Sequence, residues 1–106
     1  MSWRRFVLTP EARADLIEIW NYIAEDSIDS ADQVVARLYD AFAGLGQTPK
    51  VGRHREDLAD SRHRFWTVYS YVIAYRWETT PVQIVAIVHG ARQLEVFFQQ
   101  RITLGS

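Results

Sequence analysis

The stretch that decides the fold is "RFWTVYSYVIAYRWETTPVQIVAIV", residues 64–88. It contains three runs rich in β-branched and aromatic residues, 64–68, 71–77 and 82–88, separated by short polar connections. Such runs favour strands, and tight connections between them predict an antiparallel meander. In the middle run, alternate positions lie on opposite faces of the sheet: Tyr71, Ile73, Tyr75 and Trp77 on one, Val72, Ala74 and Arg76 on the other.

Upstream of the meander, the sequence predicts a strand and a first amphipathic helix. Residues 3–8 are β-rich and stop at Thr9-Pro10. Thr9 is a suitable N-cap, and Pro10 fits the first helical turn because its missing N–H is no loss there. Apolar residues then recur at three- and four-residue spacing as far as about Asp26: Ala12, Leu16, Ile19, Trp20 and Ile23.

A second helix is predicted to begin at Ser30, which forms a capping-box pattern with Gln33. Gly44 and Gly46 are expected to end it, with Pro49 soon after. Two amphipathic helices joined by about four residues should pack as an antiparallel hairpin, and a sheet is needed to cover their apolar stripes.

The order of elements is therefore β-α-α-β-β-β, an α+β fold with a helical hairpin on one face of an antiparallel sheet. One or two further helical turns are expected after Gly90. The first strand must return to this sheet, beside the third or fourth strand.

Length and composition limit the class of protein. The chain has 106 residues, 48% of them hydrophobic, which suits one domain with a substantial core. It has no cysteine, which excludes disulfides and thiolate metal sites. No apolar stretch approaches the roughly 20 residues of a membrane span. We expect a cytoplasmic protein with no membrane contact, no metal and no cofactor.

Charge is distributed unevenly along the chain, although the net charge is only -1. Residues 1–48 carry four arginines against eight acids, and the remainder carries eight basic residues against five acids. Eleven of the twelve basic residues are arginine, whose planar fork favours bidentate binding of carboxylate or phosphate. The pattern indicates a partner that is anionic on one side.

The stretch VHGAR, residues 88–92, places His89 and Arg92 at the end of the last strand. His89 has no neighbouring carboxylate or nucleophile in the sequence and no metal-ligand spacing to the other histidines. This favours a turn, with catalysis as the minority interpretation. For Arg92 two roles stay open: a clamp on strand-end carbonyls or a loop carboxylate, or a ligand-binding group.

Residues 47–63 are polar and predict a long ordered loop. Five arginines surround it and would form a basic surface if they converge, with a solvated loop as the alternative: Arg53, Arg55, Arg62, Arg64 and Arg76. The four tryptophans exceed the needs of so small a core, so some are expected to anchor a partner: Trp3, Trp20, Trp66 and Trp77.

Four segments, in this order, cover most of the chain: LTPEARADLIEIWNYI (8–23), TPKVGRHREDL (48–58), YVIAYRW (71–77) and IVAIVHGARQ (84–93). Together they resemble the ParE branch of the ParE/RelE superfamily of bacterial toxin-antitoxin systems. The resemblance implies the same β-α-α-β-β-β fold.

The resemblance also implies a partner, an antitoxin with a DNA-binding dimerisation part and an extended tail that wraps the toxin. No direct sequence-specific DNA binding by this chain is expected. The tail would lie on the helical hairpin and the sheet. The residues expected to receive it are Trp20, Arg53, Arg64, Tyr75 and Trp77.

Members of the ParE branch inhibit DNA gyrase by binding, whereas the RelE branch cuts messenger RNA on the ribosome. A single lysine, a C-terminal segment with phenylalanines in place of a tyrosine or histidine, and a near-neutral charge favour gyrase. The expected target contacts are Arg92, Leu94, Phe97 and Phe98. The alternative is a RelE-type endoribonuclease that uses Arg55, Arg64, Arg76 and His89. A third possibility is a binding module without toxic activity.

Overall fold

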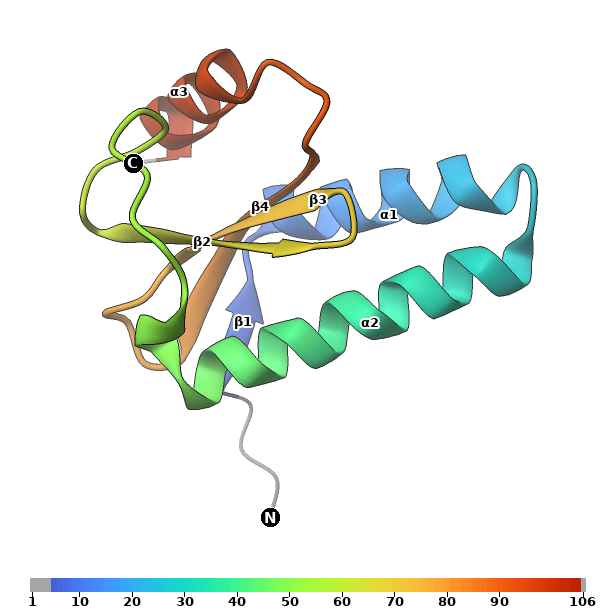
Figure 1. Ribbon diagram of the computed structural model, residues 1–106, viewed down its shortest axis with the longest axis horizontal. Coiled ribbons are helices and arrows are strands. Elements are labelled where there is room, and N and C mark those ends of the chain that lie inside the picture. The colour runs from blue at the N-terminus through green and yellow to red at the C-terminus, as the bar shows by residue number, and fades with distance from the viewer. Residues whose placement is uncertain (1–4, 106) are drawn as a thin grey trace.

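The computed structural model describes the backbone of residues 5–105 and the side chains of residues 5–102. The elements are β1 (Phe6–Leu8), α1 (Pro10–Ala24), α2 (Ile28–Gln47), a short 3-10 helix η1 (Pro49–Val51), β2 (His63–Val68), β3 (Tyr71–Arg76), β4 (Val82–His89) and α3 (Leu94–Gly105) (Figure 1). This order confirms the predicted β-α-α-β-β-β arrangement. The start of the predicted first strand, with Trp3, lies outside the described residues.

The sheet has the strand order β1-β4-β3-β2. The pairs β2–β3 and β3–β4 are antiparallel, which confirms the meander, and β1 lies beside β4 as expected. The prediction of a wholly antiparallel sheet is wrong for this last pair, because β1 and β4 are parallel. Two helices and two strands separate them in the chain, and a connection of that length permits parallel pairing.

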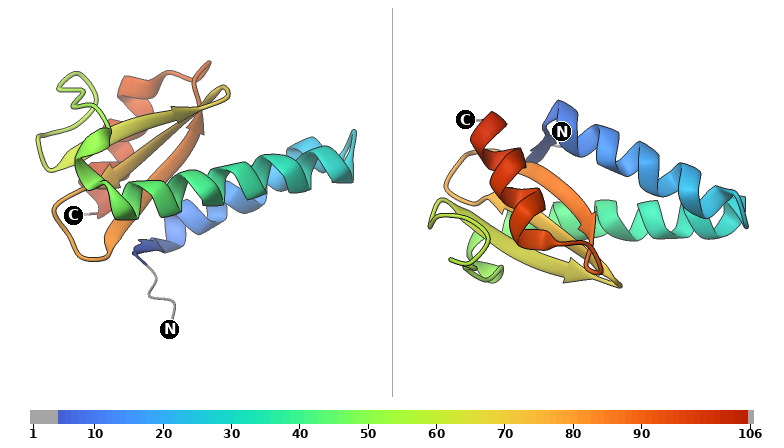
Figure 2. Two further views of the ribbon diagram at one scale, coloured as in Figure 1. Left: turned by 60° about the horizontal axis from the view of Figure 1, so that its bottom comes forward. Right: turned by 90° about the horizontal axis from the view of Figure 1, so that it is seen from above.

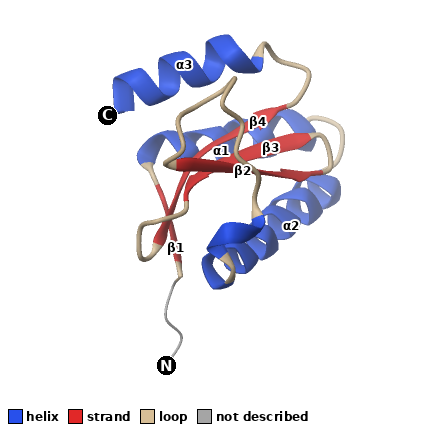
Figure 3. Cartoon of the chain, turned by 60° about the vertical axis from the view of Figure 1, so that its left-hand side comes forward, coloured by secondary structure: helices blue, strands red, loops and turns tan. Residues whose placement is uncertain are grey.

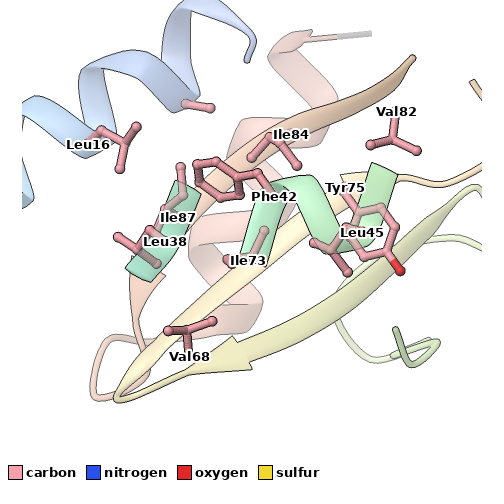
Figure 4. Close-up of a cluster of buried hydrophobic side chains, with 11 residues drawn as sticks. Leu16, Leu38, Phe42, Leu45, Val68, Ile73, Tyr75, Val82, Ile84 and Ile87 are labelled. Carbon is pink, nitrogen blue, oxygen red and sulfur yellow. The ribbon is translucent and has the colours of Figure 1, made fainter. Parts of the chain in front are cut away.

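The hairpin of α1 and α2 covers one face of the sheet, and its far end extends beyond the strands (Figures 1 and 2). The core between them contains Leu16, Leu38, Phe42, Ile73 and Tyr75, with other buried side chains from both layers (Figure 4). Ile73 and Tyr75 therefore face the hairpin, as the alternation of the middle strand predicted.

Helix α3 crosses the opposite face of the sheet (Figure 3). Beneath it lies a second cluster of buried side chains: Leu58, Phe65, Val72, Ala74, Ala86, Val88 and Phe98. The expectation of one or two turns after Gly90 is too small, since α3 has 12 residues. Its apolar residues at three- and four-residue spacing give the sheet a second cover, so the domain has three layers.

Helix α2 differs from its prediction at both ends. Ser27 caps it, with the Ser30 N–H donating to the Ser27 hydroxyl at 3.1 Å, so it begins earlier than Ser30. It also continues through Gly44 and Gly46. An ideal Cβ on Gly46 would lie 2.6 Å from the Cβ of Arg5, so this glycine allows the close approach of α2 to the start of β1.

Among the described residues, no helix combines the length and apolar character needed to span a membrane.

Candidate binding site at the end of β4

The turn predicted at His89 and Gly90 is present in the structure. The Gly90 N–H donates to the Ser70 carbonyl at 2.7 Å, and the Arg92 N–H donates to the His89 carbonyl at 3.1 Å. The His89 ring joins this turn, because its Nδ1 accepts from the Ala91 N–H at 3.1 Å. His89 is therefore a turn residue whose Nδ1 is already occupied, and the fixed turn sets the direction in which Arg92 leaves the sheet.

A groove of about 560 Å³ lies between this turn, the end of the sheet and α1. Its lining is mostly apolar and aromatic, with a few charged groups among them: Asp15, Glu18, Ile19, Tyr22, Tyr71, Ile87, Val88, His89, Ala91 and Arg92. The Tyr22 side chain is 75% exposed, and the His89 ring meets Tyr71 edge-on, with 5.4 Å between ring centroids. A groove of this size and composition suits an apolar segment of a partner.

The Arg92 side chain is exposed and forms no hydrogen bond or ion pair within the part of the chain that the structure describes. Its guanidinium carbon lies 5.5 Å from the centroid of the Phe97 ring, a cation–π contact that orients the side chain along α3. Of the two roles left open by the sequence, the clamp finds no support in these contacts. Arg92 is presented at the surface.

The clamp is formed by another pair of residues, Asp15 and Arg101. The Arg101 guanidinium donates to both Asp15 carboxylate oxygens, at 2.9 and 3.0 Å, and to the Val85 carbonyl at 2.9 Å. The same carboxylate accepts from the Ile87 N–H at 3.0 Å. The pair is largely buried, with side-chain exposures of 17% for Arg101 and 11% for Asp15, and the bond to Asp15 raises the pKa of Arg101.

This ion pair supplies hydrogen-bond partners to backbone groups of β4 beyond the point where β1 ends. The last residue of β1, Leu8, pairs with Ile84, so β4 has no strand partner beyond that point on this side. Val85 is the extra residue of a bulge, because Ala74 pairs with Ala86 while Tyr75 pairs with Ile84. Asp15 and Arg101 bind the backbone groups there that have no strand partner, and they fix α3 to both α1 and β4.

This pair was not identified from the sequence, although the position of Asp15 in the first helix could have indicated it. It lies beside Leu16 within the apolar stripe of α1 and is as buried as the core residues around it. A carboxylate at a core position needs a partner. The partner, Arg101, is 86 residues away in the chain, and no local pattern identifies it.

The predicted target contacts on α3 differ in accessibility. Leu94 and Phe97 are half-buried against the sheet, and Phe98 has no exposed surface. The Phe98 ring packs edge-on against Phe65 and Phe97, with centroid distances of 5.2 Å to each. The assignment of Phe98 as a contact residue is therefore corrected: it is a core residue, because it fills the space between α3 and β2.

The predicted antitoxin contact Tyr75 is also corrected, because it is fully buried. Its hydroxyl donates to the Pro49 carbonyl at 2.6 Å and accepts from the Gly52 N–H at 2.9 Å. Arg64 acts on the same segment, donating to the carbonyls of Lys50 and Gly52 at 2.9 and 2.7 Å. Both residues hold the loop after α2 against the sheet.

The other three predicted antitoxin contacts lie at or near the surface. Trp20 is half-buried and donates to Asp32 at 2.9 Å, joining α1 to α2. Trp77 donates to the Ser61 carbonyl at 2.9 Å, while Arg53 is exposed and pairs with β2 only through its backbone. Trp20 belongs to the hairpin and the other two to the loop region, so the structure does not join all five residues in one patch.

The alternative nuclease residues do not form one site. Arg76 is the last residue of β3, whereas His89 lies on β4 and pairs with Tyr71, the first residue of β3. Five residue steps of a strand separate these ends by about 17 Å. Arg64 is bound to the loop carbonyls, and Arg55 is bound through two nitrogens to Asp57, at 3.0 and 2.7 Å.

The sequence left open whether the five arginines around the loop converge, and the described structure does not bring all five together: Arg62 and Arg76 line one pocket, while Arg53 and Arg55 line another. Arg55 pairs with Asp57, and Arg62 donates to Asp60 through Nε and Nη2 at 3.1 and 2.6 Å. These bonds lower the pKa of both carboxyl groups and locally neutralise both arginines. The long loop is therefore a set of local ion pairs and backbone contacts.

Comparison with known proteins places this architecture in a family. The family model described as the ParE toxin of type II toxin-antitoxin system, parDE, matches residues 6–94. A protein of Sinorhizobium fredii with the printed name "Putative toxin Y4kP" is 33% identical over 93 residues, which cover 88% of this chain and 95% of that protein. A chain of the solved "Chromosomal ParDE TA system from P. aeruginosa" superposes with a TM-score of 0.66 at 22% identity, covering 79% of this chain and 92% of that one. The chain belongs to the ParE toxin family of type II toxin-antitoxin systems.

Proposed function

We propose that this toxin inhibits DNA gyrase by direct binding and is neutralised by a cognate ParD-like antitoxin. The observation that carries the proposal is Arg92, an exposed arginine on a fixed turn, without a carboxylate partner among the described residues and beside a groove of about 560 Å³. Arginine and aromatic residues next to a groove are the side chains most often responsible for affinity at protein interfaces.

The target surface that we propose consists of Arg92, Leu94 and Phe97, the accessible members of the expected set. Arg92 and Phe97 are in cation–π contact, so the two side chains form one unit at the start of α3. The Asp15–Arg101 pair holds α3 in place and keeps this unit pre-organised. Pre-organisation lowers the entropy lost on binding.

The antitoxin surface that we propose is the helical hairpin, where Trp20 lies. Large apolar side chains are exposed on it, with Ile17 57% exposed, Tyr22 75% and Ile28 60%. A disordered tail that folds on binding gains affinity from such positions. The solved structure that this chain resembles is described as a ParDE TA system, which supports a ParD-like partner.

The ribonuclease alternative has less support. Its four residues lie at separate places, and two of them, Arg55 and Arg64, already donate to protein acceptors. A shared site for a scissile phosphate needs these groups within contact of one another.

The variant Arg92→Ala tests the proposed target surface, with Arg37→Ala as a matched control. Arg37 is an exposed arginine on α2 that does not line the groove beside Arg92. We expect Arg92→Ala to weaken gyrase binding about tenfold or more, the loss typical of a central arginine. The control should bind like the unmodified protein. If folded Arg92→Ala binds gyrase with unchanged Kd, the proposed surface is wrong.

A further inference from the structure

A second pocket, of about 320 Å³, lies at the other end of the strands, away from the His89 turn. Its lining is rich in guanidinium groups: Thr9, Glu11, Arg62, His63, Arg76, Gln83, Val85, Arg101 and Ile102. The floor is a row of polar residues that crosses three strands, because His63 pairs with Arg76 and Arg76 pairs with Gln83. The last turns of α3 lie above this row and bring Arg101 to it, close to the start of α1 (Figure 2).

Arg76 is the residue of this pocket that provides the strongest reason to expect an anionic ligand. Its side chain is half-buried, yet no hydrogen bond or ion pair of its guanidinium exists within the described part of the chain. A guanidinium that is partly removed from water gains from a negatively charged acceptor. Arg76 therefore enters the pocket with all five of its donor hydrogens available.

Arg62 and Arg101 are held in place and still have donors to spare. Arg62 binds Asp60 through Nε and Nη2, which leaves Nη1 free. Arg101 binds Asp15 and Val85 with three of its five donor hydrogens. Their carboxylate partners fix both guanidinium groups before any ligand arrives. The Gln83 side chain, which makes no hydrogen bond among the described residues, adds a neutral amide.

The charges around the pocket limit how strongly it can bind an anion. Asp60 and Asp15 neutralise two of the arginines, and the Glu11 carboxylate opposes an anion directly. The formal charges of Arg62, Arg76 and Arg101 balance those of Asp60, Asp15 and Glu11, so Arg76 is the guanidinium of the pocket without a bound carboxylate in the described part of the chain. Burial lowers the pKa of His63, and the charges of Arg76 and Arg62 lower it further, against the opposing effect of Asp60. A small anion held by a few strong hydrogen bonds fits this balance better than a polyanion does.

We propose that this pocket binds a single phosphate group, either as free phosphate or as the phosphate of a small phosphomonoester. The donors come from the loop before β2 (Arg62), from β3 (Arg76), from β4 (Gln83) and from α3 (Arg101), and so approach from several directions. A tetrahedral phosphate has enough oxygens to accept from three guanidinium groups, whereas a planar carboxylate is matched by one. The pocket volume exceeds that of phosphate alone, and Val85 and Ile102 supply an apolar wall for the organic part of an ester.

The test uses the full chain, labelled with ¹⁵N in its arginine side chains, titrated with inorganic phosphate at constant ionic strength. We expect a saturable shift of the Arg76 Nε–H signal, with a Kd of about 1 mM. Arg76→Gln should weaken binding about tenfold or more, while Arg76→Lys, which retains the charge, should recover part of it. Arg13→Gln is the matched control, an exposed arginine on α1 outside the pocket, and should leave binding unchanged.

Glycerol 3-phosphate and acetate are the two further probes. Tighter binding of glycerol 3-phosphate than of phosphate would identify the ester as the ligand class, and equal binding would identify the phosphate group alone. Either result supports the site. Equal binding of acetate, unchanged binding in folded Arg76→Gln, or no saturation by phosphate would each overturn the proposal. None of these measurements depends on gyrase or on an antitoxin.

Discussion

At the scale of the residue, the ion pair of Asp15 and Arg101 connects three elements, α1, β4 and α3, through side-chain hydrogen bonds. Two carboxylate oxygens accept three hydrogen bonds, two from Arg101 and one from the Ile87 N–H, and Arg101 adds a fourth bond to Val85. Removing one partner leaves the other charge in a largely buried place, which costs more than the net value of the pair.

Arg101→Ala should therefore lower the free energy of unfolding by about 3 kcal/mol, because it leaves the Asp15 carboxylate with only a backbone donor. Urea denaturation would measure this loss. Arg13→Ala, an exposed change on the same helix as Asp15, should stay within about 0.5 kcal/mol of the unmodified protein. Equal stabilities of the two variants would contradict a structural role for the pair.

His63 makes stability depend on pH. Burial is the main cause that lowers its pKa below the ordinary value of 6.5, so the folded state favours the neutral ring. Above pH 6.5 the ring is neutral in both states and its contribution to stability is fully present. As the pH falls from 6.5 through the folded-state pKa, the unfolded chain takes up a proton first, so stability is lost.

We expect the free energy of unfolding to fall as the pH is lowered below the ordinary histidine pKa of 6.5, and to fall less in His63→Gln. Urea denaturation across this range measures both slopes. The Asp60 carboxyl that contacts this ring does not interfere, because its pKa is lowered from 3.8 and its contribution is lost only at more acidic pH. An identical slope in His63→Gln would show that another group is responsible.

At the scale of the element, the two glycines of α2 show why its end was predicted incorrectly. A glycine near a helix end usually marks a stop, yet α2 continues past both to Gln47. Gly46 is required by the contact with Arg5, which is 41 positions earlier in the chain, and Gly44 has no neighbour within 4 Å of an ideal Cβ. Local propensity cannot distinguish a glycine that ends a helix from one that permits close packing.

These two positions provide a matched pair of variants. Gly44→Ala should stabilise the protein by up to about 1 kcal/mol, because alanine is the better helix former and its methyl group meets nothing. Gly46→Ala should destabilise it by about 1–3 kcal/mol, because the new methyl group overlaps Arg5 and its backbone carbonyl, at 2.6 and 2.7 Å. Thermal denaturation measures both, and a stabilised Gly46→Ala would disprove the packing argument.

The sequence was sufficient to predict the strands and both long helices, because their apolar residues recur with the right period. It did not show that β1 pairs in parallel with β4, since nothing local records the direction of a partner strand. It also underestimated α3, whose apolar residues match a sheet face assembled from three other segments.

At the scale of the whole molecule, the site was predictable only in part. The turn at His89 agrees with the sequence, because it depends on local chemistry, whereas the sequence left open whether Arg92 is a clamp or an exposed binding group. The assignments that failed, Tyr75 and Phe98, are aromatic residues whose burial depends on how α2, the loop and α3 cover the sheet. Aromatic residues at partner surfaces and in cores look alike in a sequence.

The three layers determine where the two surfaces that we propose lie. The hairpin covers one face of the sheet, α3 covers the other, and Arg92 lies where the chain passes from β4 to α3 (Figure 1). Antitoxin contacts on the hairpin and target contacts at Arg92 meet at the groove lined by both α1 and the β4 turn. A tail bound in that groove would block the target surface directly.

The measurement that tests the central claim most directly is a DNA gyrase supercoiling assay with the purified protein, alone and with its antitoxin, in parallel with an assay of messenger RNA integrity during translation. Binding without chemistry predicts inhibited supercoiling that the antitoxin reverses, while messages stay intact. Full gyrase activity in the presence of folded protein, together with cut messages, would contradict the account and establish the ribonuclease alternative.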